Sequence, residues 1–288
     1  MRGMGLRLSV TLLTVIPWRG KPTGAATEEM TGVGGTGEIG GGAVPALPQA
    51  AVAAAMAWAP AVGLLLGVIA SAVLVVADHP LGAGPLTAAG LAVGSLALLS
   101  RGLHLDGLAD LADGLASGKP APAALDIMRR SDIGPLGTVT LILTLLIQVA
   151  ALSQAESAGH GRGPAALIAA VVTGRLALTW ACRRGVAAAR PDGLGALVAE
   201  SVRPAVPAVE TVATLAAATA AVVISAVVGG EPLGWTLPLA VLAGLGVAFA
   251  VQRHAVRRLG GITGDVLGAL AEIATTVALV VAAMGPAA

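Results

Sequence analysis

The chain has 288 residues, of which 56% are hydrophobic and only 11% are charged. Soluble domains carry roughly 25% charged residues, so this chain could not cover a soluble surface, and lipid must surround most of it. The net charge of +1 gives no indication of a nucleic-acid partner. The single cysteine, Cys182, excludes a disulfide framework and a Cys-based zinc site, and no two of the four histidines stand at i, i+4.

The N-terminal region combines a short apolar run with a long polar segment. Residues 6–18 are apolar and have Arg2, Arg7 and Arg19 as basic neighbours. A signal peptide is one interpretation, but no small-residue cleavage site follows directly, so we expect a short interfacial or half-inserted helix. Residues 20–48 are rich in Gly, Thr and Pro, which predicts a flexible loop that buries no core.

Seven apolar stretches follow, and most approach the length of about 20 residues that a membrane-spanning helix requires. They are residues 52–77, 85–100, 134–152, 164–182, 207–228, 236–251 and 266–284, of which the second and sixth are short. The predicted fold is therefore an all-α, polytopic transmembrane helix bundle, with residues 1–288 forming a single integral membrane domain.

Lysine and arginine alternate along the connections between these stretches. Counted from the N-terminal region to the C-terminal tail, the connections contain 4, 0, 4, 1, 4, 0, 3 and 0 of them, and Arg175 lies inside the fourth stretch. Because Lys and Arg resist translocation, the basic connections should face the cytoplasm. This pattern predicts a multi-pass protein of the cell membrane with its N-terminus inside and its C-terminus outside.

The most informative motif is the sequence RGLHLDGLADLADGLASG at residues 101–118. Asp106, Asp110 and Asp113 are spaced i, i+4 and i+7, so at about 100° per residue they share a stripe of roughly 60° on one helix face. Like charges so arranged repel one another unless a cation lies between them, and oxygen ligands favour Mg²⁺, Mn²⁺ or Ca²⁺. A solvated acidic helix face is the simpler interpretation, but Leu and Ala fill the positions between the carboxylates.

A basic pair, Arg129 and Arg130, stands just before the third apolar stretch. The pair could simply anchor the protein on the inner side of the membrane. On the same membrane side as the aspartates, it could also hold a phosphate group.

Residues 257–272 carry two further carboxylates, Asp265 and Glu272, which share a helix face because they are seven residues apart. Glu272 would lie about two turns inside the seventh stretch, where an ionisable side chain usually has a function. Helix packing would explain the nearby glycines but not the two carboxylates.

Three other polar residues are candidates for substrate binding. Arg175 lies about two turns from the cytoplasmic end of the fourth stretch, where it could either extend to the membrane surface or contact substrate. Arg190 belongs to a turn-forming Arg-Pro-Asp-Gly sequence. His104 precedes Asp106 by two residues, and we expect an ordinary surface histidine there rather than a general base.

Together these residues place carboxylates and arginines on one side of a membrane. Phosphoryl transfer depends on a divalent cation at the phosphate oxygens, on nearby positive charge and on an oriented nucleophile. The residues therefore favour a membrane-embedded, Mg²⁺-dependent transferase that acts on a phosphate-bearing substrate.

Four motifs in this chain resemble the cobalamin synthase family. They are GLHLDGLADLADG at 102–114, DIMRRSDIGPLG at 126–137, ARPDGLG at 189–195 and GGITGDVLGALAE at 260–272. The resemblance implies an adenosylcobinamide-GDP ribazoletransferase, a multispanning Mg²⁺ enzyme. In that reaction a ribose hydroxyl of α-ribazole, or of its 5′-phosphate, attacks the cobinamide-side phosphorus of adenosylcobinamide-GDP, and GMP leaves.

The resemblance also implies roles for individual residues. Asp106, Asp110 and Asp113 match the acidic motif and are expected to bind the metal and the diphosphate. Asp265 and Glu272 match the C-terminal motif. The chain departs from the pattern at Arg130 and Asp132, where many members carry the opposite charges.

Two other functions remain as alternatives. A CDP-alcohol phosphotransferase-like lipid enzyme would also use an Asp-rich helix, but Asp106-Gly107 is followed here by Ala109-Asp110, which does not fit its usual motif. An ion-coupled transporter would place its carboxylates near the middle of the bilayer, where Glu272 is the main candidate. The expected partners are adenosylcobinamide-GDP, α-ribazole and membrane lipid but no nucleic acid, and a homo-oligomer is left open.

Overall fold

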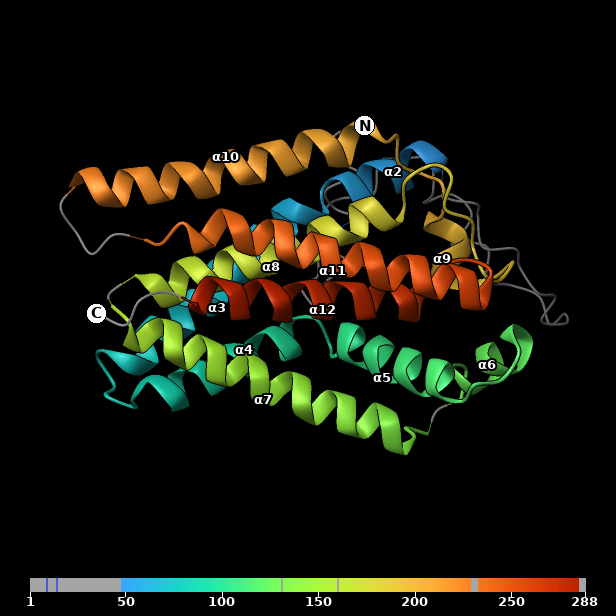
Figure 1. Ribbon diagram of the computed structural model, residues 1–288, viewed down its shortest axis with the longest axis horizontal. Coiled ribbons are helices and arrows are strands. Elements are labelled where there is room, and N and C mark those ends of the chain that lie inside the picture. The colour runs from blue at the N-terminus through green and yellow to red at the C-terminus, as the bar shows by residue number, and fades with distance from the viewer. Residues whose placement is uncertain are drawn as a thin grey trace, which may run out of the picture.

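The computed structural model describes Ser9, Thr14 and residues 48–130, 132–159, 161–228 and 233–284. Apart from Ser9, Thr14 and Pro48, the expectations for residues 6–18 and 20–48 concern parts of the chain outside this description. The longer described elements are all helices (Figure 1). They are α2 (Gln49–Ala57), α3 (Ala59–Asp78), α4 (Pro85–Leu99), α5 (Leu103–Ala116), α6 (Ala121–Ile127), α7 (Pro135–Ser157), α8 (Arg162–Ala181), α9 (Gly193–Val198), α10 (Ala205–Val228), α11 (Thr236–Leu259) and α12 (Gly264–Ala283).

Six of the described helices are long and apolar enough to cross a membrane, namely α3, α7, α8, α10, α11 and α12. Helices α4 and α5 pass the same test only as a pair, and the pair is bent by 88°. The predicted all-α polytopic bundle is therefore confirmed. The first predicted stretch, residues 52–77, is divided at Trp58 between α2 and α3. The second, residues 85–100, contains α4, which is too short to cross a membrane as a single helix.

The bend between α4 and α5 is produced by two consecutive residues in the left-handed region. Arg101 has φ 56° and Gly102 has φ 65°. Such a conformation suits glycine and is unfavourable for arginine, so the chain accepts local strain at Arg101. As a result, the chain turns by nearly a right angle into the acidic helix α5, which packs against both α7 and α12.

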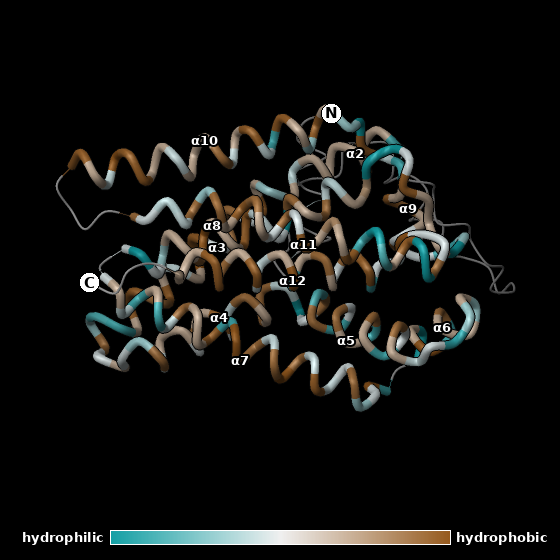
Figure 2. Tube along the Cα trace, viewed as in Figure 1, coloured by the Kyte–Doolittle hydropathy of each residue, from teal (hydrophilic) through white to brown (hydrophobic). Residues whose placement is uncertain are grey.

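Helices α8 and α12 form the centre of the bundle, and α10 is the most exposed of the crossing helices (Figures 1 and 2). Glycines bring the central helices close together. A Cβ atom on Gly174 of α8 would lie 2.6 Å from the carbonyl oxygen of Ala271 in α12. This close approach is typical of helix packing in membranes, where small residues replace the hydrophobic effect as the basis of association.

The two ends of the bundle differ in charge. The described parts of the connections 117–134, 182–204 and 260–263 adjoin α6, α9 and the end of α5, and we call this the arginine-rich end. At the arginine-poor end, α3 finishes at Asp78, α7 at Ser157 and α10 at Val228. Hydrophilic residues are visible around α6 and α9 at the arginine-rich end in Figure 2.

Candidate active site

Helix α5 carries the three aspartates predicted from the sequence, and glycines fix its position against α12. A Cβ atom on Gly107 would lie 2.8 Å from the carbonyl oxygen of Asp265, and one on Gly268 would lie 3.1 Å from the Cα atom of His104. Since neither position has room for a side chain, the two helices touch backbone to backbone. The first turn of α12 thus lies beside the acidic stripe of α5.

Asp106, Asp110 and Asp265 face one another across this contact. The half-buried Asp110 carboxylate experiences repulsion from Asp106, Asp265 and Asp113 and attraction from the Arg190 guanidinium. Asp265 is held by its neighbour Thr263, whose hydroxyl donates a hydrogen bond to Asp265 Oδ2 at 3.2 Å. The same hydroxyl accepts a hydrogen bond from the Val266 N–H and so caps α12.

Asp113, the third aspartate of the stripe, lies against α7. Its carboxylate accepts hydrogen bonds from the backbone N–H groups of Gly134 at 2.7 Å and Gly137 at 2.9 Å. These donors belong to the first turn of α7, where four N–H groups have no partner within the helix. Asp113 therefore caps α7, a role that the spacing of the aspartates does not reveal.

Arg190 reaches the acidic residues because its loop is paired with the start of α12. Ala189 N–H donates to Ile262 O at 2.9 Å, and Ile262 N–H donates to Ala187 O at 2.9 Å. The Arg190 side chain then donates to Leu125 O at 2.6 Å, and its Nη1 lies 4.0 Å from Asp265 Oδ2. Arg190 Nε has no hydrogen-bond partner among the residues that the structure describes.

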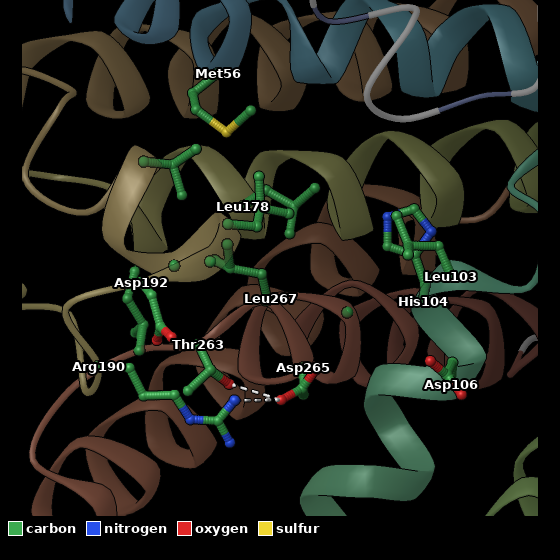
Figure 3. A pocket seen from close by; sticks show the side chains of 17 residues that line it. Met56, Leu103, His104, Asp106, Leu178, Arg190, Asp192, Thr263, Asp265 and Leu267 are labelled. Carbon is green, nitrogen blue, oxygen red and sulfur yellow. Dashed lines mark hydrogen bonds and ion pairs between the residues drawn. The ribbon is translucent and has the colours of Figure 1, made fainter. Parts of the chain in front are cut away.

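A cavity of about 270 Å³ opens between α5, α9, α12 and the ends of α2 and α8 (Figure 3). Asp106, Asp265 and Arg190 lie along one side. The opposite side is apolar, and its residues include Met56 and Leu178. Such a division, with a few polar groups facing an apolar wall, is typical of sites for small molecules and cofactors.

His104 also lines the cavity, although its side chain is almost completely buried. Within the described part of the chain, its Nδ1 atom has no hydrogen-bond partner. The prediction of a surface histidine is therefore wrong, because the contact between α5 and Gly268 encloses the imidazole in the bundle.

Arg129 lies apart from the cavity. Its Nη2 donates to both oxygens of Asp192, at 2.8 and 3.0 Å, in an exposed ion pair. Asp192 itself lines the cavity, so this ion pair connects Arg129 to the site.

Glu272 and Arg175 do not line this cavity. They belong to a second, smaller polar group inside the bundle, which surrounds a space of about 20 Å³. Gln148 Nε2 donates to Glu272 Oε2 at 3.0 Å and to Thr276 Oγ1 at 2.9 Å. Arg175 is buried in the same group, and no described residue forms a hydrogen bond with its Nε. Gln148 was not among the predicted site residues, although a lone amide within an apolar stretch is a usable signal in the sequence.

Comparison with known proteins adds to this geometry. A model of the cobalamin-5-phosphate synthase family matches residues 5–283. A protein from Frankia casuarinae named adenosylcobinamide-GDP ribazoletransferase is 46% identical over 237 residues, which cover 80% of this chain and 84% of the relative. A protein of the same name from Desulforamulus reducens is 32% identical over 275 residues, which cover 94% and 92%. No solved structure gives a significant match.

The matched region includes every helix that lines the cavity and nearly the whole of the bundle. The resemblance found in the four sequence motifs is thus confirmed over almost the full length of the chain. The protein is a membrane-embedded transferase, and it belongs to the cobalamin-5-phosphate synthase family.

Proposed function

We propose that this chain is an adenosylcobinamide-GDP ribazoletransferase of the cell membrane. The convergence of Asp106, Asp110, Asp265 and Arg190 beside one cavity, in a chain whose relatives carry that name, is the observation behind the proposal. A ribose hydroxyl of α-ribazole, or of its 5′-phosphate, forms a bond to the cobinamide-side phosphorus. The phosphoanhydride P–O bond breaks, GMP leaves, and the hydroxyl loses its proton.

The carboxylates suit a magnesium ion. Among the described residues, the ligand atoms of the cavity aspartates do not come within 4.8 Å of one another as a group of three. Mg²⁺ does not require such a group, because it usually keeps several waters and binds through one or two carboxylates together with substrate phosphates. Asp106 and Asp110, with Asp265 opposite, would hold the ion, since Asp113 is already engaged in capping α7. When bound, the ion would neutralise charge on the diphosphate.

The chain's own residues supply the remaining requirements for positioning. Arg190 and His104 both line the cavity, so each could contact a polar atom of the substrate. The guanidinium is the better phosphate partner because of its charge and its planar set of donors. The apolar wall formed with Met56 and Leu178 suits the base of α-ribazole.

The distribution of charge supports a cytoplasmic cavity. The cavity opens at the arginine-rich end of the bundle, where α5, α9 and the start of α12 meet. Basic connections remain on the cytoplasmic side during insertion. The adenosylcobinamide-GDP and the α-ribazole would therefore enter from the cytoplasm.

The test is GMP release from adenosylcobinamide-GDP by purified protein in detergent, with and without α-ribazole and Mg²⁺. We expect release only when both are present, and loss of release in Asp110→Asn. Asp126→Asn is the matched control, because Asp126 is an exposed residue of the neighbouring helix α6. Full activity in Asp110→Asn would remove the acidic stripe from the mechanism. Accumulation of substrate in sealed vesicles without GMP release would support a transporter instead.

A further inference from the structure

A second group of metal-ligating side chains lies at the arginine-poor end of the bundle. Asp78 ends α3, His79 follows it directly, and Glu156 lies in the last turn of α7. One ligand atom from each of the three lies within 4.8 Å of the others. We call these residues the Asp78 cluster. Met56 precedes α3, so the cavity is at the opposite end of that helix from the Asp78 cluster.

Each carboxylate of the Asp78 cluster lies nearest to a different nitrogen of the His79 ring, and only one of these nitrogens can bind a given ion. His79 Nε2 lies 3.6 Å from Glu156 Oε1, and His79 Nδ1 lies 3.9 Å from Asp78 Oδ2. Both separations exceed the range of about 2.7–3.2 Å for a hydrogen bond from nitrogen to oxygen. Ligands bound tetrahedrally to zinc at about 2.0–2.1 Å are roughly 3.3–3.4 Å apart, close to the distance between His79 and Glu156.

The three side chains of the Asp78 cluster differ in how far they are exposed to solvent. The Glu156 side chain is 3% exposed and the Asp78 side chain 13%, whereas that of His79 is 45% exposed. Gly163 at the start of α8 leaves room for the Glu156 carboxylate, which a Cβ atom at that position would overlap. The two carboxylates are thus buried at this end of the bundle. The imidazole is exposed, so an ion could approach the cluster from solvent past His79.

We propose that the Asp78 cluster binds Zn²⁺ through one imidazole nitrogen and two carboxylate oxygens, with water as the remaining ligand. With a neutral imidazole the cluster carries two negative charges, which a divalent cation neutralises. Imidazole nitrogen favours zinc and related metals over Mg²⁺ and Ca²⁺, which prefer all-oxygen sites. The ion joins the end of α3 to the end of α7, two helices that both pack against α4.

The experiment uses Co²⁺ as a spectroscopic substitute for Zn²⁺. Purified, EDTA-treated protein in detergent is titrated with Co²⁺ in excess Mg²⁺, and visible d–d absorption is followed. We expect one Co²⁺ per chain, displaced by Zn²⁺, and binding at least about tenfold weaker in His79→Ala and Glu156→Gln. His254→Ala is the matched control, since His254 is an exposed histidine of α11.

Two further measurements separate loss of the ion from loss of the fold. Each variant must elute as the wild-type protein does in gel filtration, and Asp78→Asn provides an independent change at the same cluster. Zn²⁺ should raise the Tm of the wild type but not that of His79→Ala, because a ligand that binds only the folded state stabilises it. Absence of Co²⁺ absorption in the wild type, or equal affinity in His79→Ala, would overturn the proposal. So would loss of binding in Asp106→Asn, which would assign the ion to the cavity.

Discussion

The carboxylate of Asp113 accepts a hydrogen bond from the backbone N–H of Gly134 at 2.7 Å and so ties α5 to the first turn of α7. The second carboxylate oxygen accepts the N–H of Gly137. A negative charge at this point also interacts favourably with the dipole of α7. The sequence motif assigned Asp113 to metal binding, which remains a prediction, whereas its contacts give it a structural role.

Replacing Asp113 by Ala should lower the free energy of unfolding by about 1–2 kcal/mol, as the loss of a helix cap does. Asp113→Asn should be affected less, because its amide oxygen can still accept one bond. The measurement is chemical unfolding in detergent without added Mg²⁺, with Asp126→Ala as the control. Equal stability of Asp113→Ala and the wild type would show that the cap contributes nothing.

Gly107 sets the distance between α5 and α12. In Gly107→Ala the new Cβ atom would lie 2.8 Å from Asp265 O, so the helices must move apart and the aspartates with them. We expect a loss of activity of at least about tenfold. In Gly90→Ala, a helical glycine with no atom within 4 Å of its Cβ position, activity should persist and stability should rise by up to about 1 kcal/mol. Equal activities in the two variants would contradict the close contact.

Arg190 and Arg129 should differ sharply in their effects. Removing the Arg190 guanidinium takes away a charged donor beside Asp265, so Arg190→Ala should lower kcat/KM for adenosylcobinamide-GDP by about 10- to 100-fold. Arg190→Lys keeps the charge and should recover part of the loss. Arg129→Ala breaks only an exposed pair with Asp192, which is typically worth about 0–1 kcal/mol. The measurement is the steady-state kinetics of GMP release by the three variants, and an equal loss in Arg190→Ala and Arg129→Ala would contradict the prediction.

Gln148→Leu should destabilise the bundle by about 0.5–2 kcal/mol, because it removes the donor to Glu272 from a membrane interior. Gln154→Leu is a matched control on the same helix. Gln154 is exposed and donates to Ala283 O at 3.2 Å, so its loss should matter less. Thermal unfolding of both variants in detergent provides the measurement, and a larger effect at Gln154 would refute this account of the interior group.

Most membrane-crossing helices could be predicted from the length of the apolar stretches. The common helix face of the three aspartates in α5 could be predicted from their spacing. The course of the second crossing could not be predicted, because α4 is short and α5 is interrupted by carboxylates. Its direction depends on the positive φ angles at Arg101 and Gly102. A sequence shows neither those angles nor the packing that tolerates them.

Four residues that line the cavity, Asp106, His104, Asp265 and Arg190, could be named as candidates from the sequence, but their arrangement could not be predicted. The approach of Arg190 to Asp265 depends on backbone pairing between Ala189 and Ile262, which are 73 positions apart. Local sequence gave only a turn at Arg190. Glu272 was grouped with Asp265 because they share a helix face, yet two turns of α12 separate the cavity from the interior polar group.

The bend between α4 and α5 also bears on how the protein is made. Helix α4 has 15 residues, fewer than the 17 or so that a single helix needs to span a bilayer. Its contacts are with α3, which is synthesised earlier, and with α7, which is synthesised later. Helix α4 should therefore enter the membrane as a hairpin with α3, and it should reach its final position only after α7 has left the ribosome.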